Sequence, residues 1–451
     1  MPPWSYRAPE VFRRPRRRRG KRIRRAPTSE KVFLAGWEPS LRAGRIPGRP
    51  EAEDSLQELR ELAVGAGGRI VGSLLQRSPQ PDPATLLGKG KLNEVRSAAH
   101  AAAADLVILD HDLTPSQLRN LERGLDLRVI DRTQLILDIF ASRARSREGQ
   151  LQVELAQLSY LLPRLGGRGT ELSRLGGGIG TRGPGEQQLE YDRRRIRARI
   201  RSLRAAIEKV RSQRALHRAR RRDHQFLTVA LVGYTNAGKS TLFNALTSSA
   251  VFTSSRLFAT LDPTVRALPL PSRRPVLLSD TVGFIQKLPP HLVAAFRATL
   301  EELEDASLLL HVTDASDARH DSQDSAVEAL LETLSVGATP RLHLWNKIDL
   351  VDAIGRNRLP TGPQDVWVSA STGEGLEVLL QRIDQSLMED PVIEADFELS
   401  PADGESLALL HRSGVVLSTR YEDDRVRVRA RLRESLRERL KSAEEKAVLE
   451  Q

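Results

Sequence analysis

The 451-residue sequence contains no cysteine. Disulfide bonds, thiolate metal sites and cysteine nucleophiles are therefore excluded, and a chain without cysteine fits a reducing compartment. No apolar run approaches the roughly 20 residues that a membrane-spanning helix needs, and the N-terminus lacks an apolar signal core. Hydrophobic residues make up 39% and charged residues 28%, close to the averages for soluble proteins. We therefore expect a folded cytoplasmic protein with no membrane span.

Positive charge is concentrated in two short segments. The formal net charge is +12, yet residues 1–25 alone carry +10 and residues 193–222 carry +13, so the rest of the chain is net acidic. Clustered basic charge is typical of proteins that bind a polyanion, most often nucleic acid. For 1–25 a disordered tail is an equally good interpretation. For 193–222 we favour RNA, because a helical pattern would hold these charges on a rigid rod.

The pattern of apolar residues divides the chain into five parts. Between 31 and 131, short apolar runs alternate with helical patterns, which is typical of a small parallel α/β domain. A longer alternation of the same kind starts near 226. The fold class is therefore α/β, and the expected parts are a disordered basic tail (1–28), an N-terminal α/β domain (29–131), a helical hairpin (132–224), a nucleotide-binding domain (225–390) and a small C-terminal α/β domain (391–451).

The predicted hairpin has two apolar stripes that flank a glycine-rich break at 163–185. The first stripe runs from Leu151 to Leu162 and the second from Leu189 to Val210, both at helical spacing. Two such stripes can bury each other in an antiparallel hairpin. The break holds nine glycines and four arginines. A plain connector needs neither that length nor those arginines, so we favour a loop that orders on a partner.

The strand predicted at 226–232 runs into a phosphate-binding loop. The loop fits the pattern G-x-x-x-x-G-K-[ST] and reads Gly233-Tyr234-Thr235-Asn236-Ala237-Gly238-Lys239-Ser240. Its glycines let backbone N–H groups face the phosphates, Lys239 neutralises the β and γ oxygens, and the Ser240 hydroxyl ligates Mg²⁺. The helix that begins at Ser240 and contains Thr241 adds its N-terminal dipole.

Two further segments are expected to meet the γ-phosphate and Mg²⁺. Asp280-Thr281-Val282-Gly283 follows a predicted strand; Asp280 should bind Mg²⁺ through water, and the Gly283 N–H should meet the γ-phosphate. A switch-like segment precedes it and reads Phe258-Ala259-Thr260-Leu261-Asp262. We expect Thr260, or alternatively Thr264, to complete the Mg²⁺ shell. The candidate catalytic residues are Lys239, Thr260 and Gly283, and the candidate metal ligands are Ser240 and Thr260.

The base-binding residues follow a third predicted strand and read Asn346-Lys347-Ile348-Asp349. The Asp349 carboxylate can accept hydrogen bonds from guanine N1–H and the exocyclic amine, whereas adenine offers no such donor pair. A loop after a fourth strand, Ser369-Ala370-Ser371, can supply a backbone N–H to the guanine oxygen. Any one motif could be a surface turn. All of them in this order at strand ends predict a GTP site, because open α/β sheets bind ligands at that edge.

One residue departs from the common GTPase pattern. Phe284 follows Gly283, where many GTPases place a glutamine that orients the attacking water. Because phenylalanine cannot hold water, we predict slow intrinsic hydrolysis and a partner that supplies or repositions the missing polar group.

Together these residues resemble the HflX family of translation-factor-related GTPases. The resemblance rests on 234–241, 258–262, 280–284 and 346–349, and it covers roughly residues 30–390. It extends to three stretches that are not generic GTPase motifs, namely Asp131-Arg132-Thr133, Ala141-Ser142-Arg143-Ala144 and Gly180-Thr181-Arg182-Gly183-Pro184-Gly185-Glu186. The tail at 1–25 looks like an addition, so nothing about its role carries over.

The resemblance implies a cytoplasmic GTPase that binds the large ribosomal subunit and splits idle or stalled ribosomes, with Mg²⁺ on Ser240 and Thr260. It also implies that the hairpin and its glycine-rich loop face ribosomal RNA, and it links the N-terminal domain to ATP. In that domain Gly88-Lys89-Gly90-Lys91 precedes a helix and could hold an anion, although a tight turn with solvated lysines is the more common explanation. We expect a monomer.

Three functions remain open on the sequence alone. The first is a GTPase that remodels or splits ribosomes. The second is a GTPase that acts on immature subunits during ribosome assembly. The third is a mainly RNA-binding protein with vestigial nucleotide turnover, against which the intact Lys239, Ser240 and Asp349 argue.

Overall fold

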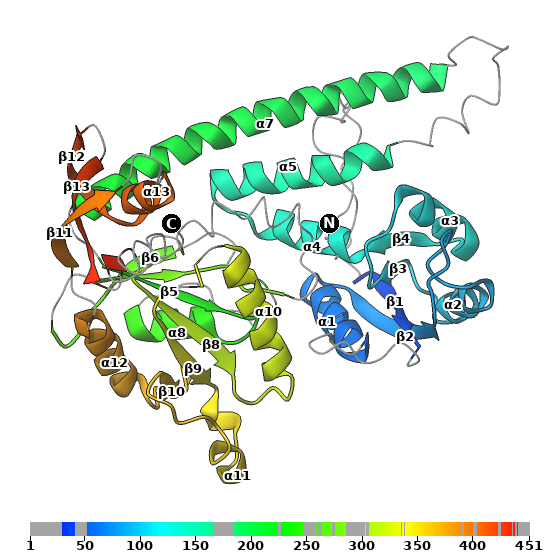
Figure 1. Cartoon of the computed structure of the whole chain (residues 1–451). Helices are drawn as coiled ribbons and strands as arrows, with labels where there is room; N and C mark the ends of the chain where they lie inside the picture. The colour runs from blue at the N-terminus through cyan, green and yellow to red at the C-terminus, as the bar shows by residue number, and fades with distance from the viewer. Residues whose placement is uncertain are drawn as a thin grey trace, which may run out of the picture.

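The structure is a computed structural model with three β-sheets and a long helical hairpin (Figure 1). The basic tail predicted at 1–28 and most of the glycine-rich break lie outside the described residues. Within the described part, no helix has both the length and the apolar character needed to cross a membrane. The residues that the structure describes are 29–40, 52–165, 184–223, 227–247, 258, 264–272, 276–285, 303, 306–334, 336–337, 339–389, 392–399, 404–422, 425–434, 436–437 and 440.

The N-terminal domain is a four-stranded parallel sheet in the order β2-β1-β3-β4, which confirms the predicted parallel α/β domain. The inner strand β3 is buried along its whole length, as a parallel strand covered on both faces must be. The elements are β1 (Lys31–Pro39), α1 (Ala52–Gly65), β2 (Arg69–Ser78), α2 (Lys89–Ala101), β3 (Leu106–Leu109), α3 (Pro115–Leu125) and β4 (Arg128–Asp131).

The stretch Gly88–Lys91 at the start of α2 makes contacts within its own domain. The Gly88 N–H donates to Oε1 of Gln76 at 2.9 Å, and Lys91 pairs with Glu94 at 2.7 Å. These contacts fit the interpretation as a tight turn. The ATP site linked to this domain stays a prediction.

Three helices follow: α4 (Arg132–Arg143), α5 (Arg147–Arg164) and α7 (Pro184–Asp223). The predicted antiparallel hairpin is confirmed, because Leu158 of α5 packs against Ile196, Ile200 and Leu203 of α7 (Figure 1). Arg199 of α7 adds a two-pronged contact to Glu154 of α5, with both N–O distances at 2.7 Å.

Helix α4 was not predicted from the sequence as a separate element. Its N-cap is Asp131, whose Oδ1 accepts a hydrogen bond from the Gln134 N–H at 2.8 Å. Seven of its residues are buried, including the consecutive Leu135, Ile136 and Leu137. Because burial covers more than one face, α4 lacks the single apolar stripe by which a surface helix is recognised.

The nucleotide-binding domain is a six-stranded sheet in the order β10-β9-β8-β5-β7-β6, parallel except for the edge strand β6. Helices α8 and α12 cover one face, and α10 covers the other. The elements are β5 (Leu227–Gly233), α8 (Lys239–Thr247), β6 (Thr264–Leu268), β7 (Val276–Asp280), β8 (Leu308–Asp314), α10 (His320–Thr333), β9 (Arg341–Asn346), the 3₁₀ turn η2 (Ile348–Leu350), α11 (Ala353–Arg356), β10 (Asp365–Trp367) and α12 (Leu376–Glu389).

The C-terminal domain is a three-stranded antiparallel sheet in the order β11-β13-β12 with one helix. Along β13, Val426, Val428 and Ala430 are buried, whereas the alternating arginines face outward and pair with Glu394 and Glu398 of β11. The elements are β11 (Val392–Leu399), α13 (Gly404–Ser413), β12 (Val415–Glu422) and β13 (Arg425–Arg433).

One hydrophobic core joins the N-terminal and nucleotide-binding domains. It contains Leu59 of α1 and Phe140 of α4 together with Tyr234, Phe258 and Phe284, three residues of the nucleotide motifs. The packing places the N-terminal domain directly against the predicted site, an arrangement that the sequence did not predict.

Candidate nucleotide-binding site

The phosphate loop is held in a tight curve between β5 and α8. Gly238 has a φ of +95°, and a Cβ there would lie 2.2 Å from Nδ2 of Asn346, so only glycine fits. The Lys239 side chain is buried, and its ammonium donates to the carbonyl oxygens of Gly233 at 2.9 Å and Tyr234 at 2.5 Å. Burial lowers the pKa of Lys239 to about 8, with Asp280 acting in the opposite direction.

The two oxygen groups expected at the Mg²⁺ position lie together. The Ser240 hydroxyl, in the first turn of α8 beside Thr241, donates to Oδ2 of Asp280 at 2.8 Å, and Asp280 is fully buried at the end of β7. A hydroxyl and a carboxylate are ligands that Mg²⁺ prefers, so this pair fits the ion. Thr264 opens β6 as the antiparallel partner of Asp280. The other switch residues, Ala259, Thr260, Leu261 and Asp262, lie outside the described residues.

The D-x-x-G segment packs against the phosphate loop. Thr281 donates to the Leu231 carbonyl at 2.6 Å, and Val282 is buried. A Cβ on Gly283 would lie 2.9 Å from Cα of Thr235 and 3.0 Å from Nζ of Lys239, so this close approach requires glycine. The D-x-x-G segment therefore lies directly beside Thr235 and Lys239, and its contact with the γ-phosphate stays a prediction.

Phe284, the residue after the D-x-x-G segment, is part of the hydrophobic core. Its carbonyl accepts from the Thr235 N–H at 2.8 Å, and its N–H donates to the Gly233 carbonyl at 3.2 Å. Its ring is 4% exposed and belongs to the core shared with the N-terminal domain. A buried phenylalanine ring offers an attacking water no hydrogen bond, and slow intrinsic hydrolysis stays a prediction.

The predicted base-binding residues are bonded to the phosphate loop through Asn346. Its Nδ2 donates to the Ala237 carbonyl at 2.8 Å, and its Oδ1 accepts from the Ala370 N–H at 3.0 Å. The Asp349 carboxylate accepts from the Ser369 hydroxyl at 2.6 Å, which fixes its orientation.

The other residues of the two predicted base-binding loops lie next to Asn346, Asp349 and Ser369. Lys347 has a φ of +64° and pairs with Asp314 at 2.5 Å, and Ile348 is buried beside it. The Ser371 hydroxyl lies 3.1 Å from that of Ser369. The predicted phosphate and base segments thus come together at the carboxyl ends of β5, β7, β9 and β10.

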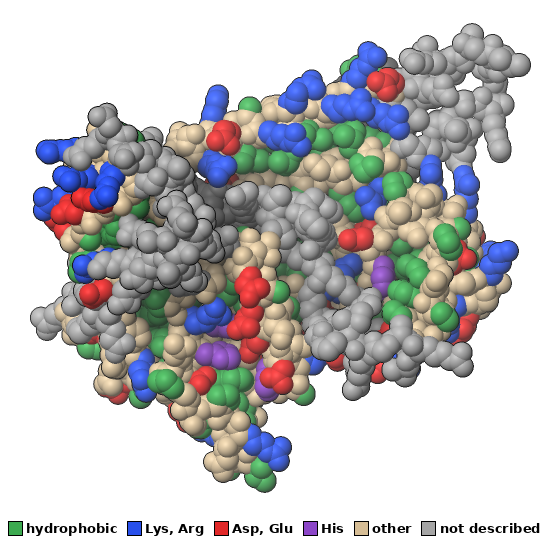
Figure 2. Space-filling view, viewed as in Figure 1, with side chains coloured by type: hydrophobic (Ala, Val, Ile, Leu, Met, Phe, Trp, Pro, Cys, Tyr) green, Lys and Arg blue, Asp and Glu red, His purple; other side chains and the backbone are tan. Residues whose placement is uncertain are grey.

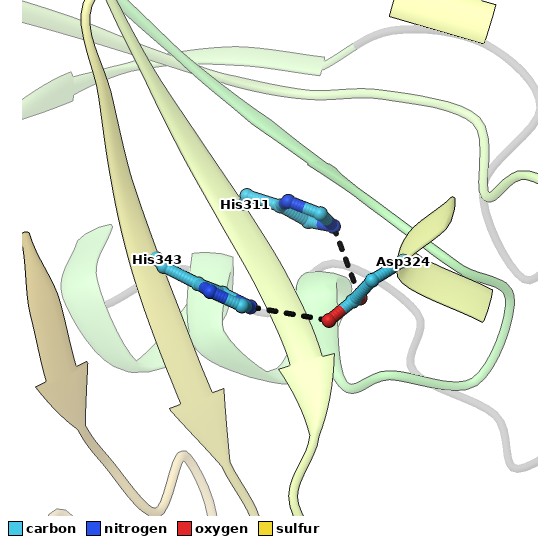
Figure 3. Close-up of side chains that lie close together, drawn as sticks. All are labelled: His311, Asp324 and His343. Atoms are coloured by element: carbon cyan, nitrogen blue, oxygen red, sulfur yellow. Dashed lines mark ion pairs between the residues drawn. The ribbon is translucent and has the colours of Figure 1, made fainter. Parts of the chain in front are cut away.

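A second polar cluster lies on the face of the six-stranded sheet that α10 covers, between β8, β9 and α10 (Figure 3). His311 and His343 each point at Asp324, with N–O distances of 3.2 and 3.3 Å, and Thr313 donates to the same carboxylate at 2.6 Å. The two imidazole rings stack at 4.9 Å with an interplanar angle of 17°. The Asp324 carboxylate thus already accepts a hydrogen bond from Thr313 and contacts both imidazoles. We therefore interpret the cluster as a network that fastens α10 to the sheet.

We expect Asp324→Asn to lower the free energy of unfolding by about 1–3 kcal/mol at pH 7, because it removes the charge that both histidines contact. Burial alone would raise the pKa of Asp324, yet its contacts with His311 and His343 hold the pKa well below 3.8. The stabilisation is therefore fully present above about pH 4 and is lost as pH falls through the lowered pKa.

Urea unfolding of the wild type and the Asp324→Asn variant at pH 7 and pH 3 measures this effect. The difference between the two proteins should shrink at pH 3. Asp321→Asn is the matched control, because the Asp321 side chain on the same helix is 94% exposed. Equal differences at both pH values would contradict the assignment.

Residues of the N-terminal domain and of α4 reach the site, and they were not predicted from the sequence. Tyr234 of the phosphate loop donates its hydroxyl hydrogen to Glu58 of α1. Arg143, the last residue of α4, donates to the Phe258 carbonyl at 2.9 Å. A cavity of about 80 Å³ lies between α1 and the phosphate loop, with Glu58, Tyr234 and Thr235 among its lining residues. The only sequence signal for this contact was that 131–133 and 141–144 are not generic GTPase motifs.

Comparison with known proteins gives three consecutive family matches. Residues 53–141 match the family described as GTP-binding GTPase N-terminal, 143–221 the GTP-binding GTPase middle region, and 228–347 the 50S ribosome-binding GTPase. The chain is 47% identical over 395 residues to the GTPase HflX of Caldanaerobacter subterraneus subsp. tengcongensis, covering 87% of this chain and 91% of that protein. It is 44% identical over 375 residues to the GTPase HflX of Escherichia coli, covering 82% and 88%.

A solved structure is also similar. It is a GTP-binding protein from the archaeon Sulfolobus solfataricus in complex with GDP, 24% identical, with a TM-score of 0.41, covering 80% of this chain and 99% of that chain.

Proposed function

Because the chain belongs to the HflX family of GTPases, we propose that it binds the large ribosomal subunit and uses GTP to remodel or split ribosomes. GTP binding and hydrolysis follow from the family itself. The ribosomal role is our inference from the description of the matched family as 50S ribosome-binding and from the surface described next.

The observation that carries the proposal is the basic outer face of α7 (Figure 2). The apolar stripe of this helix is turned onto α5, and several of the arginines whose side chains are described lie on the outer side. Arg194, Arg197, Arg201 and Arg204 are exposed along one stretch of the rod. A row of guanidinium groups on a rigid helix suits a phosphate backbone, because no backbone order has to be gained on binding. Ribosomal RNA is the polyanion that a ribosome-binding GTPase would meet.

For the nucleotide site we propose the roles that the sequence motifs assign. Ser240 and Thr260, or Thr264 in its place, would hold Mg²⁺, and Asp280 would act through water. Lys239 and the Gly283 N–H would stabilise charge on the γ-phosphate, and Asp349 would select guanine. Bound Mg²⁺ would supply charge neutralisation between the β and γ oxygens.

We also propose that GTP hydrolysis is slow until the protein contacts the ribosome. The buried Phe284 leaves the position of the usual water-orienting glutamine without a polar side chain. Contact of the hairpin with ribosomal RNA would complete the site, and the GTP-bound state would last until that contact forms.

Sedimentation of purified whole ribosomes with the protein tests the proposed role. We expect conversion of whole ribosomes to subunits with GTP and much less with GDP. Lys239→Ala should abolish the conversion, because it removes the charge that neutralises the phosphates. Association with immature particles alone would instead support the assembly role. Binding that ignores both nucleotide and Lys239→Ala would support the RNA-binding role with vestigial turnover.

A further inference from the structure

The phosphate loop is bonded to the N-terminal domain through the Tyr234 side chain. The Tyr234 hydroxyl donates to Oε1 of Glu58, a residue 176 positions earlier in the chain, and the ring is 6% exposed. A tyrosine hydroxyl buried against a carboxylate forms a charge-assisted hydrogen bond, which is directional and stronger than a neutral one. The place of Tyr234 therefore depends on where Glu58 is held.

Glu58 is itself fixed by a buried ion-pair network. Its Oε2 pairs with the guanidinium of Arg132, and Arg132 pairs with Asp110 at 2.8 Å. Ser55 donates to Asp110 at 2.6 Å, which satisfies the carboxylate from the other side. Arg132 is 2% exposed. Because buried charges are stable only when paired, this network holds Glu58 in one position.

Helix α4 makes a second contact with the site at its other end. Arg143 donates to the Phe258 carbonyl at 2.9 Å, and Phe140 meets the Phe258 ring edge-on with 4.6 Å between centroids. Phe258 has a φ of +58°, a left-handed conformation that is uncommon for phenylalanine and needs support from its surroundings. Arg132 opens α4 and Arg143 ends it, so one helix supports both the phosphate loop and the switch residue.

The start of α4 is also bonded to the helical hairpin. Asp131, the residue before α4, pairs with Arg164 at 3.2 Å, and Arg164 is the last residue of α5, where the glycine-rich break begins. Arg164 also donates to the Leu113 carbonyl at 2.6 Å. Asp131, which pairs with the last residue of α5, is thus adjacent to Arg132, which pairs with Glu58.

We propose that Glu58 and Arg143 are positioning residues for the GTPase site, through which the N-terminal domain and α4 set nucleotide affinity. Neither residue belongs to a nucleotide motif. Each holds a residue of a nucleotide motif, Tyr234 or Phe258, by a directional hydrogen bond. The inference concerns the purified chain and does not depend on the ribosomal role. Since coupling between two sites is reciprocal, bound nucleotide must in turn stabilise α1 and α4.

The first test is the dissociation rate of a fluorescent GDP from the Tyr234→Phe variant. This change removes one hydroxyl and keeps the packed ring, so the fold should survive. We expect dissociation about fivefold faster than in the wild type, at the lower end of measured coupling effects. Tyr421→Phe is the matched control, because Tyr421 is 75% exposed in the C-terminal domain. An unchanged rate in Tyr234→Phe would overturn the proposal.

A double-variant cycle separates positioning from a general loss of stability. Glu58→Gln and Tyr234→Phe should each accelerate dissociation, and the double variant should be no faster than the faster single one, because both break the same bond. Multiplied effects would contradict the shared bond. Should Glu58→Gln fail to fold, Arg143→Lys tests the second contact, since a single ammonium cannot reproduce the reach of the guanidinium.

Hydrogen exchange provides the reciprocal readout. In the wild type, GDP should slow exchange of the amides of α1 and α4, and in Tyr234→Phe the slowing in α1 should be lost. An effect of GDP on α1 that is the same in both proteins would contradict the inference. Both measurements need only GDP binding, so their failure leaves the ribosomal proposal standing and is distinguishable from its failure.

Discussion

Replacement of Asp349 by asparagine is expected to lower GTP affinity by about 10³-fold. The Asp349 carboxylate accepts from guanine N1–H and the exocyclic amine in the proposed complex. An amide can still accept from N1–H, but its NH₂ group faces the amine, so two donors oppose each other. The Ser369 hydroxyl holds the side chain at 2.6 Å and prevents it from turning away.

The same variant should gain affinity for xanthosine triphosphate. Xanthine carries an oxygen where guanine carries the amine, so the asparagine NH₂ can donate to it. Competition binding with GTP and xanthosine triphosphate measures both effects. Asp352→Asn is the control. Asp352 lies three residues after Asp349, is exposed and is the N-cap of the short helix α11. Retained GTP selectivity in Asp349→Asn would contradict the assignment of this loop as the base-binding site.

Removal of three arginines from the outer face of α7 is expected to weaken binding to the large ribosomal subunit by about 10²-fold or more at physiological salt. The triple variant Arg197→Ala, Arg201→Ala and Arg204→Ala leaves the apolar stripe on α5 intact. Alanine also favours the helix, so the fold should persist. The slope of log affinity against log salt should fall by about one for each phosphate that the helix no longer neutralises.

A matched control removes the same charge elsewhere. Arg425, Arg427 and Arg429 lie on the exposed face of β13, where they pair with Glu398 and Glu394. Their replacement by alanine should leave subunit binding and its salt dependence nearly unchanged. Equal losses of affinity in the two triple variants would indicate a nonspecific effect of net charge, and unchanged affinity in the α7 variant would contradict α7 as the binding surface.

The nucleotide motifs could be predicted because each carries its chemistry in a short stretch. Gly238, Lys239 and Ser240 are adjacent in sequence, and the chemistry of phosphate binding fixes their order. The structure then brings these residues near Asp280 and Asn346, as the rule for parallel sheets requires. The alternation of strand and helix patterns was likewise enough to predict the parallel sheet of the N-terminal domain.

The contacts between domains could not be predicted, because they join residues far apart in the chain. Nothing local in Glu58 or Tyr234 indicates a bond across 176 positions. Arginine is a residue type that is mostly exposed, yet Arg132 is 2% exposed. Helix α4 escaped prediction for a related reason, since a helix buried on several faces lacks the periodicity that identifies a surface helix.

The measurement that tests the account most directly is GTP turnover by the purified protein, titrated with isolated large ribosomal subunits and, in parallel, with small subunits. With Phe284 buried in the core, turnover of the protein alone should be slow. It should rise at least about tenfold and saturate with the large subunit only, as expected when a partner completes a GTPase site. Fast hydrolysis without a partner, or turnover that large subunits leave unchanged, would contradict the account.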